Sequence, residues 1–189
     1  MALNVVQYEG IVSLLRQVPP LVDKLEARHS GFADEVLAWL KDAESTLESN
    51  RLPVVSQISA CRAMLIEAAR GVQSDDISYA GRPTVRKMQE ATASLVLQRG
   101  SDLLHAEIAE RAAAFQEAER ISRQIIAVAD VKGMLQTCGD GRSHQAFLAC
   151  VQEQVAADQD LASVYVHLVA LVGKTDVLIF FDRALASLA

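Results

Sequence analysis

Residues 104–132 read LHAEIAERAAAFQEAERISRQIIAVADVK, and this stretch decides the fold. It contains no proline or glycine, and small and apolar residues recur in it every three or four positions. The stripe continues past its end and is formed by Leu104, Ile108, Ala112, Phe115, Ala118, Ser122, Ile125, Val128 and Leu135. Such spacing is typical of a helix whose apolar side packs as in a coiled coil. The sequence therefore predicts one very long helix.

This helical pattern extends in both directions. It begins near Pro83 and ends at Lys132-Gly133, so we expect the helix to cover residues 83–132. At 1.5 Å per residue it would be about 75 Å long, whereas a compact globule of this chain length is about 40 Å across. We therefore expect an elongated bundle. The alternative is a break at Gly100, where the missing side chain could instead permit close packing.

The rest of the chain is also helical in pattern. Glycine and proline number only 9 and 4 in 189 residues, and 51% of the residues are hydrophobic. Further helices are expected over residues 5–18, 20–47, 53–71, 143–173 and 175–188. The prediction is an all-α fold of five or six helices in a single domain, residues 1–189. An α+β alternative pairs residues 164–172 with residues 177–181 as a small hairpin.

Charge and hydropathy exclude two classes of partner. The net charge is −6 and no segment gathers Lys and Arg into a phosphate-binding stripe, so we expect no nucleic acid. Residues 161–181 are apolar enough to span a membrane, but they include Lys174 and Asp176. Because charges are costly in hydrocarbon, we expect a buried core helix and no membrane insertion.

The expected compartment is the cytoplasm. No basic segment precedes an apolar one near the N-terminus, so a secretory signal is not expected. The cysteines, Cys61, Cys138 and Cys150, are odd in number and widely spaced, which favours free thiols. Cys138 follows a polar residue in a loop and should be exposed, whereas Cys61 and Cys150 lie on apolar stripes and should be buried.

Two sequence pairs have metal-ligand spacing. Glu26 and His29 form E-x-x-H, and Asp102 and His105 form D-x-x-H. Residues at i and i+3 face the same side of a helix, which is how metal-binding bundles supply carboxylate and imidazole ligands. With 24 acidic residues in the chain, such pairs arise readily by chance. We expect no metal and no cofactor, and a metal- or ligand-binding bundle is the alternative function.

Two further groups of residues carry weaker chemical hypotheses. Arg99 and His105 have the R-x(4–6)-H spacing seen in helical ribonucleases of the HEPN type, in which both residues act at the phosphate and 2′-hydroxyl. The net negative charge of this chain disfavours RNA binding. A hydrolase of this type is therefore the third hypothesis. Arg142 and His144 lie in a glycine-containing loop before a helix, where they could bind an anion. A solvated connector whose glycines serve turns is the preferred interpretation of that loop.

The favoured function is a non-enzymatic adaptor, scaffold or regulator that acts through helix–helix contacts between proteins. Apolar residues occupy most directions around the helix expected after residue 161, so it must be covered on nearly every side. A second copy of the chain is the simplest cover, which predicts a homodimer. The expected interface residues are Leu168, Leu171, Val172, Phe180 and Phe181.

Overall fold

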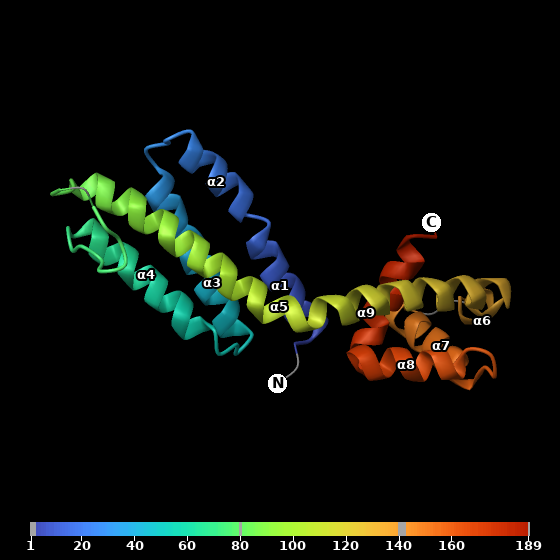
Figure 1. Cartoon of the computed structure of the whole chain (residues 1–189). Helices are drawn as coiled ribbons and strands as arrows, with labels where there is room; N and C mark the ends of the chain where they lie inside the picture. Colours follow the sequence, from blue (N-terminus) through green and yellow to red (C-terminus); the bar gives the residue numbers. More distant parts are fainter. Residues whose placement is uncertain (1–2, 80, 140–142, 189) are drawn as a thin grey trace. The chain divides into compact units, whose positions relative to one another are not determined.

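The computed structural model describes residues 3–79, 81–139 and 143–188, and every regular element within these ranges is an α-helix (Figure 1). The helices are α1 (Val5–Leu15), α2 (Val18–Glu26), α3 (Phe32–Ser49), α4 (Val55–Ala69), α5 (Val85–Val131), α6 (Met134–Cys138), α7 (His144–Ala157), α8 (Ala162–Val172) and α9 (Lys174–Ala186). The predicted all-α class is confirmed. So is the very long helix, since α5 has 47 residues.

The alternative C-terminal hairpin is wrong, because residues 177–181 lie inside α9. Val177, Phe180, Phe181 and Ala184 are all buried in this helix. Their spacing of three, one and three positions places them on one helical side. The apolar run therefore supplies a buried helical face.

The helices pack as two compact units, which we describe separately. The N-terminal unit comprises residues 6–109, and the C-terminal unit comprises residues 3–5 together with residues 110–188. Helix α5 contributes residues to both units. The single domain expected for residues 1–189 stays a prediction, because compact units defined by contacts are not thereby separate domains.

Two expected helices are divided in the structure. The helix expected over residues 20–47 is α2 and α3, separated by residues that include Arg28 at a positive φ of 52°. The helix expected over residues 143–173 is α7 and α8. Asp158 follows α7, and its Oδ1 accepts hydrogen bonds from the backbone N–H groups of Asp160 at 3.0 Å and Leu161 at 3.1 Å. The Asp158 carboxylate thereby closes the turn that precedes α8, a role typical of aspartate.

The N-terminal unit is built around α3, which packs against both α2 and α4 (Figure 1). Its buried side is formed by Phe32, Val36, Trp39, Leu40, Ala43 and Leu47. Trp39 also donates a hydrogen bond from Nε1 to the carbonyl oxygen of Leu14 at 3.0 Å, which fixes its indole ring. A buried indole N–H that finds a partner in this way has little freedom to move.

Gly100 is where α5 meets this indole ring. A Cβ atom built on Gly100 would lie 3.0 Å from two ring carbons of Trp39 and 3.6 Å from Cδ1 of Ile58. The helix continues through Gly100 without a break. The missing side chain therefore permits close packing of α5 on α3 and α4, which was the second role expected for this glycine.

In the C-terminal unit, α8 lies antiparallel to the second half of α5. Nη1 of Arg111 donates to the carbonyl oxygen of Leu171 at 3.1 Å, near the end of α8. Twenty-one residues further along the chain, Lys132 contacts Asp158 and Asp160, just before α8 begins. Helices α7 and α9 pack against α8 as well.

A disulfide joins α6 to α7. It links Cys138 at the end of α6 to Cys150 in α7, with 5.8 Å between the Cα atoms. Both cysteines are buried, so the prediction of an exposed free thiol at Cys138 is wrong. Gly133, at a φ of +74°, lets the chain reverse after α5 and brings α6 against α7. Cys61 is a buried free thiol, as expected.

No single helix in the described ranges is long and apolar enough to cross a membrane. Helices α8 and α9 pass such a test of length and composition only when taken together, and they bend by 111° at their junction.

The close approach at Gly100 generates a stability prediction. Alanine is favoured over glycine by about 1 kcal/mol within a helix, whereas overpacking of a fixed core costs about 1–3 kcal/mol. Because Trp39 is fixed by its hydrogen bond, we expect Gly100→Ala to lower the free energy of unfolding by about 1 kcal/mol. Urea denaturation measures the change. Gly10→Ala is the matched control, since its Cβ would meet only the Thr46 methyl group, at 3.3 Å, and the Asn50 amide, at 3.9 Å. A stabilised Gly100→Ala variant would contradict the role assigned to Trp39.

Candidate functional site

The four potential metal ligands are not brought together. Glu26 is the last residue of α2, and His29 follows it in the turn before α3, where Nδ1 lies 3.9 Å from Oε1 of Glu35. Asp102 and His105 lie on α5. Among the residues that the structure describes, no group of three or more His, Cys, Asp or Glu side chains could hold a metal ion.

The residues of the hydrolase hypothesis also lie apart. Both belong to α5, in which six positions correspond to about 600° of rotation, so Arg99 and His105 point about 120° away from each other. The guanidinium of Arg99 instead lies 3.3 Å from Oδ2 of Asp76. In the described structure Arg99 thus faces a carboxylate, and the hydrolase stays a hypothesis.

The anion-site hypothesis for the loop before α7 is only partly described. Arg142 lies outside the described residues. His144 is the first residue of α7, and its Nε2 lies 2.6 Å from Oδ1 of Asp182 in α9. A carboxylate so close to the imidazole competes with any anion there.

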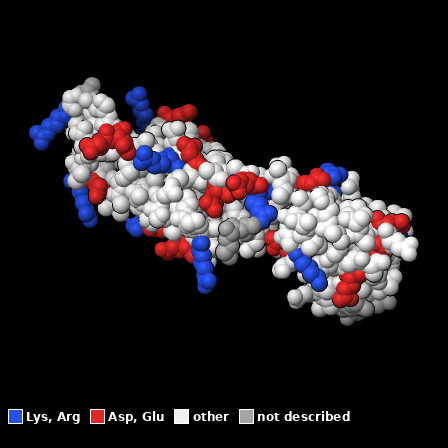
Figure 2. Space-filling view, turned by 60° about the horizontal axis from the view of Figure 1, so that its bottom comes forward, with Lys and Arg blue, Asp and Glu red and all other residues white. Residues whose placement is uncertain are grey.

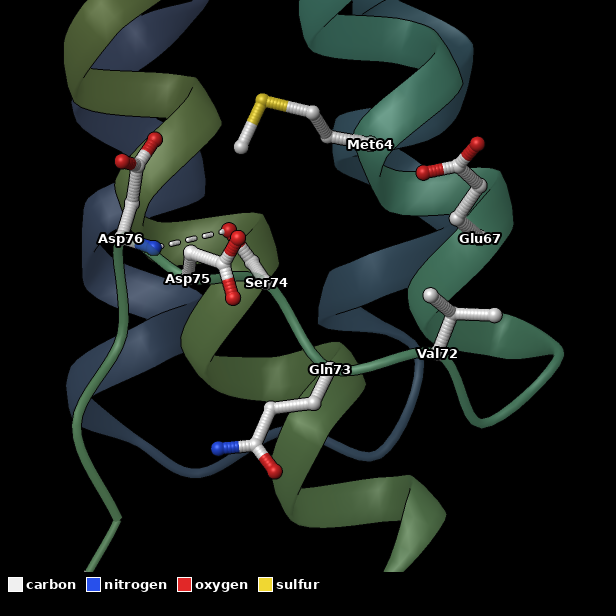
Figure 3. Close-up of a pocket in the computed structure, with 7 residues that line it drawn as sticks. All are labelled: Met64, Glu67, Val72, Gln73, Ser74, Asp75 and Asp76. Atoms are coloured by element: carbon white, nitrogen blue, oxygen red, sulfur yellow. Dashed lines mark hydrogen bonds between the residues drawn. The ribbon is translucent and has the colours of Figure 1, made fainter.

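Of the described pockets, one is acidic and lies in the N-terminal unit (Figure 3). It has a volume of about 300 Å³ and is lined by Met64, Glu67, Val72, Gln73, Ser74, Asp75 and Asp76. The carboxylates of Glu67 and Asp76 lie on opposite sides of it. Asp76 is already paired with Arg99. The arrangement does not converge on a ligand.

A second pocket, of about 310 Å³, lies beside Cys61 between α4 and α5. Its lining also includes Met64, Arg99 and Leu103. Burial raises the pKa of the Cys61 thiol, and the nearby charge of Arg99 opposes this effect only in part. A thiol held protonated is a poor nucleophile, so this pocket has no activated cysteine.

The predicted interface residues divide into two groups. Leu168, Phe180 and Phe181 are buried within the C-terminal unit. Phe180 packs against Phe115 of α5, with 6.0 Å between ring centroids. These three side chains therefore belong to the core of one chain and offer no surface to another, which corrects the sequence-based assignment. Leu171 and Val172 are half-buried.

The surface of α8 is the feature that the fold leaves unexplained. This helix has no charged residue, yet only Tyr165 and Leu168 are buried among its members. Its exposed residues at the spacing i, i+3, i+4 and i+7 are Ser163, Val166, His167 and Ala170. We call these four residues the α8 face. Val166 is 65% exposed, an unusual environment for a valine on a helix of this composition.

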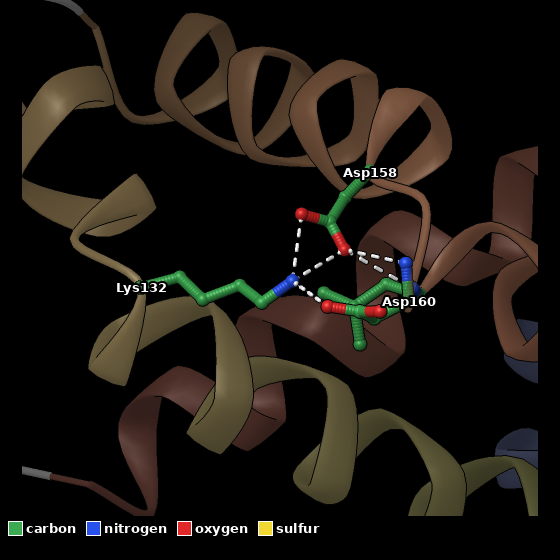
Figure 4. A network of polar contacts seen from close by, with 4 residues as sticks. Lys132, Asp158 and Asp160 are labelled. Atoms are coloured by element: carbon green, nitrogen blue, oxygen red, sulfur yellow. Dashed lines mark hydrogen bonds and ion pairs between the residues drawn. The ribbon is translucent and has the colours of Figure 1, made fainter.

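An ion-pair network holds the beginning of α8 in place (Figure 4). Nζ of Lys132 lies 2.7 Å from Oδ1 of Asp158 and 2.7 Å from Oδ2 of Asp160. Hydrogen bonding to Lys132 lowers the pKa of Asp158, and hydrogen bonding to Asp158 is the largest cause of the raised pKa of Lys132. Asp158 also closes the turn before α8. The network therefore positions the helix that carries the exposed face.

Comparison with known proteins gives no relative. No family model, curated protein or solved structure matches this chain.

The Lys132 network generates a pH-dependent stability prediction. The pKa of Asp158 is lowered on folding, so its stabilisation is fully present above the unfolded pKa of about 3.9 and is lost as the pH falls through the lower folded value. Asp158→Asn keeps a side-chain oxygen for the turn but removes the charge. We expect this variant to unfold at lower urea concentration at pH 7, with the deficit shrinking at acidic pH. Asp160→Asn, at the more exposed partner, should have a smaller effect. Equal effects, or a deficit independent of pH, would contradict this role for Asp158.

A metal prediction follows from the separation of the potential ligands. Native mass spectrometry of the purified protein should show no stoichiometric transition metal, and His105→Ala should leave the bound mass unchanged. One or two metal ions per chain that disappear in His105→Ala would contradict this reading.

Proposed function

We propose that this chain is a non-enzymatic helical protein that acts through helix–helix contacts, and that the α8 face is the surface by which it forms a homodimer. The observation that carries the proposal is the contrast within α8, a helix without charge that is covered on one side only. A helix that is apolar in most directions is stable when neighbours cover most of it.

The α8 face lacks charged residues, and this favours a second copy of the chain as its occupant despite the net charge of the protein. The protein carries a net charge of −6, so two copies repel one another over most approaches. Acidic and basic side chains are interspersed over the face drawn in Figure 2, so that face has no surface of single sign to steer a foreign partner. The α8 face contains no Asp, Glu, Lys or Arg. Glu117 of α5 interacts electrostatically with His167, so one acidic side chain borders this face.

The small size of α8 limits the affinity. At 1.5 Å per residue its 11 residues are about 16 Å long, whereas stable interfaces bury about 1,600 Å² in total. Leu171 and Val172, which are half-buried, would add contact area at the edge of this face. We therefore expect a dimer with a micromolar dissociation constant rather than an obligate one.

We propose no catalytic role. The metal-site and hydrolase hypotheses both require side chains to converge, and neither set of residues does so in the described structure. A cytoplasmic location stays part of the proposal. It requires the Cys138–Cys150 bond to be reversible, because lasting disulfides are rare in that compartment.

Replacing Val166 tests the proposed dimer. A two-fold interface contains each substituted position twice, so Val166→Asp introduces two like charges into one contact. We expect the dissociation constant to rise at least ten-fold, as measured by sedimentation equilibrium at micromolar concentrations, while the far-ultraviolet circular dichroism is unchanged.

Val22→Asp is the matched control, because it places the same charge on a valine of the N-terminal unit that is 39% exposed. This variant should dimerise like the parent. A parent protein that is monomeric at 100 µM, a concentration well above the expected micromolar constant, would overturn the proposal. So would equal weakening by both substitutions.

A further inference from the structure

Residues 132–138, which follow α5, are held against the rest of the C-terminal unit at both ends. At the start of this segment, Lys132 is paired with Asp158 and Asp160, and the chain then reverses at Gly133. At its end, Cys138 is bonded to Cys150 of α7. The five-residue helix α6 lies between these two fastenings.

The disulfide is the main anchor of α6. Cys138 is the one buried residue in this helix, while Met134 and Leu135 are half-exposed and Gln136 and Thr137 are exposed. A single turn of helix is not stable by itself in water, so its position depends on what holds it. With little other buried surface, α6 stays on α7 chiefly because of the covalent bond.

Helix α7, by contrast, does not need the bond. Its residues Val151 and Val155 are fully buried, and it packs against both α8 and α9. Opening the disulfide therefore affects the two sides unequally: α7 keeps its core contacts, and α6 loses its anchor.

We propose that the Cys138–Cys150 bond is a redox-sensitive latch, which docks α6 on α7 when oxidised and releases α6 when reduced. In the opening step a dithiol reductant gives up two electrons and becomes a disulfide. The Sγ–Sγ bond breaks, and each cysteine sulfur takes one proton from the reductant. The closing step is thiol–disulfide exchange with a disulfide of the glutathione type, which leaves as two thiols.

The third cysteine does not interfere with this exchange. Cys61 is buried in the N-terminal unit, whereas the bonded pair lies in the C-terminal unit. Burial raises the pKa of Cys61 and keeps it protonated, and a thiol without thiolate character exchanges slowly. The latch is therefore expected to have two states, with Cys61 free in both.

The experiment compares the oxidised and reduced full-length protein. The chain is equilibrated with glutathione disulfide or with a dithiol reductant, and alkylation followed by intact mass counts the free thiols after unfolding. Hydrogen exchange then reports the amides of residues 135–138 in α6 and of residues 151–155 in α7. Cys138→Ser/Cys150→Ser fixes the open state, and Cys61→Ser is the control that keeps the latch.

The latch predicts one free thiol after oxidation and three after reduction. Exchange at residues 135–138 should be at least ten-fold faster in the reduced protein and in the double variant, with residues 151–155 still protected. Failure of the bond to form with glutathione disulfide would overturn the proposal, as would unchanged exchange in α6. Faster amide exchange in α7 as well would also overturn it, because the disulfide would then stabilise the whole unit and not α6 alone.

Discussion

The apolar stripe of a 47-residue helix has to be covered over most of its length, and the rest of this structure depends on that requirement. At 1.5 Å per residue α5 is about 70 Å long, so its two halves need separate sets of partners. In the N-terminal unit the stripe is buried through Val96, Leu97 and Leu104. In the C-terminal unit it is buried through Ile121, Ile125 and Ile126. The chain accordingly divides its remaining helices between the two halves.

The two halves are covered unequally. In the N-terminal unit the indole of Trp39 approaches α5 so closely that a side chain at position 100 would crowd the ring. In the C-terminal unit α5, α7 and α9 leave one side of α8 uncovered, and that side lacks charge. Both units nevertheless have fully buried residues, among them Leu104 in the first and Phe181 in the second.

Much of the fold could be predicted from local signals. Pro83 and Gly133 bracket α5 in the sequence, and the structure places its ends at Val85 and Val131, within two residues of the expected range. The continuity of α5 through Gly100 was also expected, but its contact with Trp39 could not be predicted, because the two residues are 61 positions apart in the chain. The disulfide could not be predicted either, since a separation of 12 residues forms no motif and the pairing arises from the reversal at Gly133.

Some of the errors in the site were avoidable. Helical rotation alone separates Arg99 from His105 once both are assigned to one helix. Asp158 before Leu161 is a recognisable turn residue, and it marks the division between α7 and α8. The burial of Phe180 and Phe181 was predictable from their spacing with Val177 and Ala184. Whether such a face packs within one chain or against another was not, because periodicity identifies a buried side without identifying what buries it.

The central claim, that two copies meet through the α8 face, is tested most directly by a distance between copies. A nitroxide label on Ala170→Cys, in a Cys61→Ser background with the disulfide closed, reports dipolar coupling between two chains. Helices in contact across a two-fold axis place such labels within about two helix diameters, roughly 20–24 Å. The account predicts a coupling at that distance that weakens on dilution. Absence of coupling at high concentration, or a coupling that instead arises from a label on Val22→Cys, would contradict it.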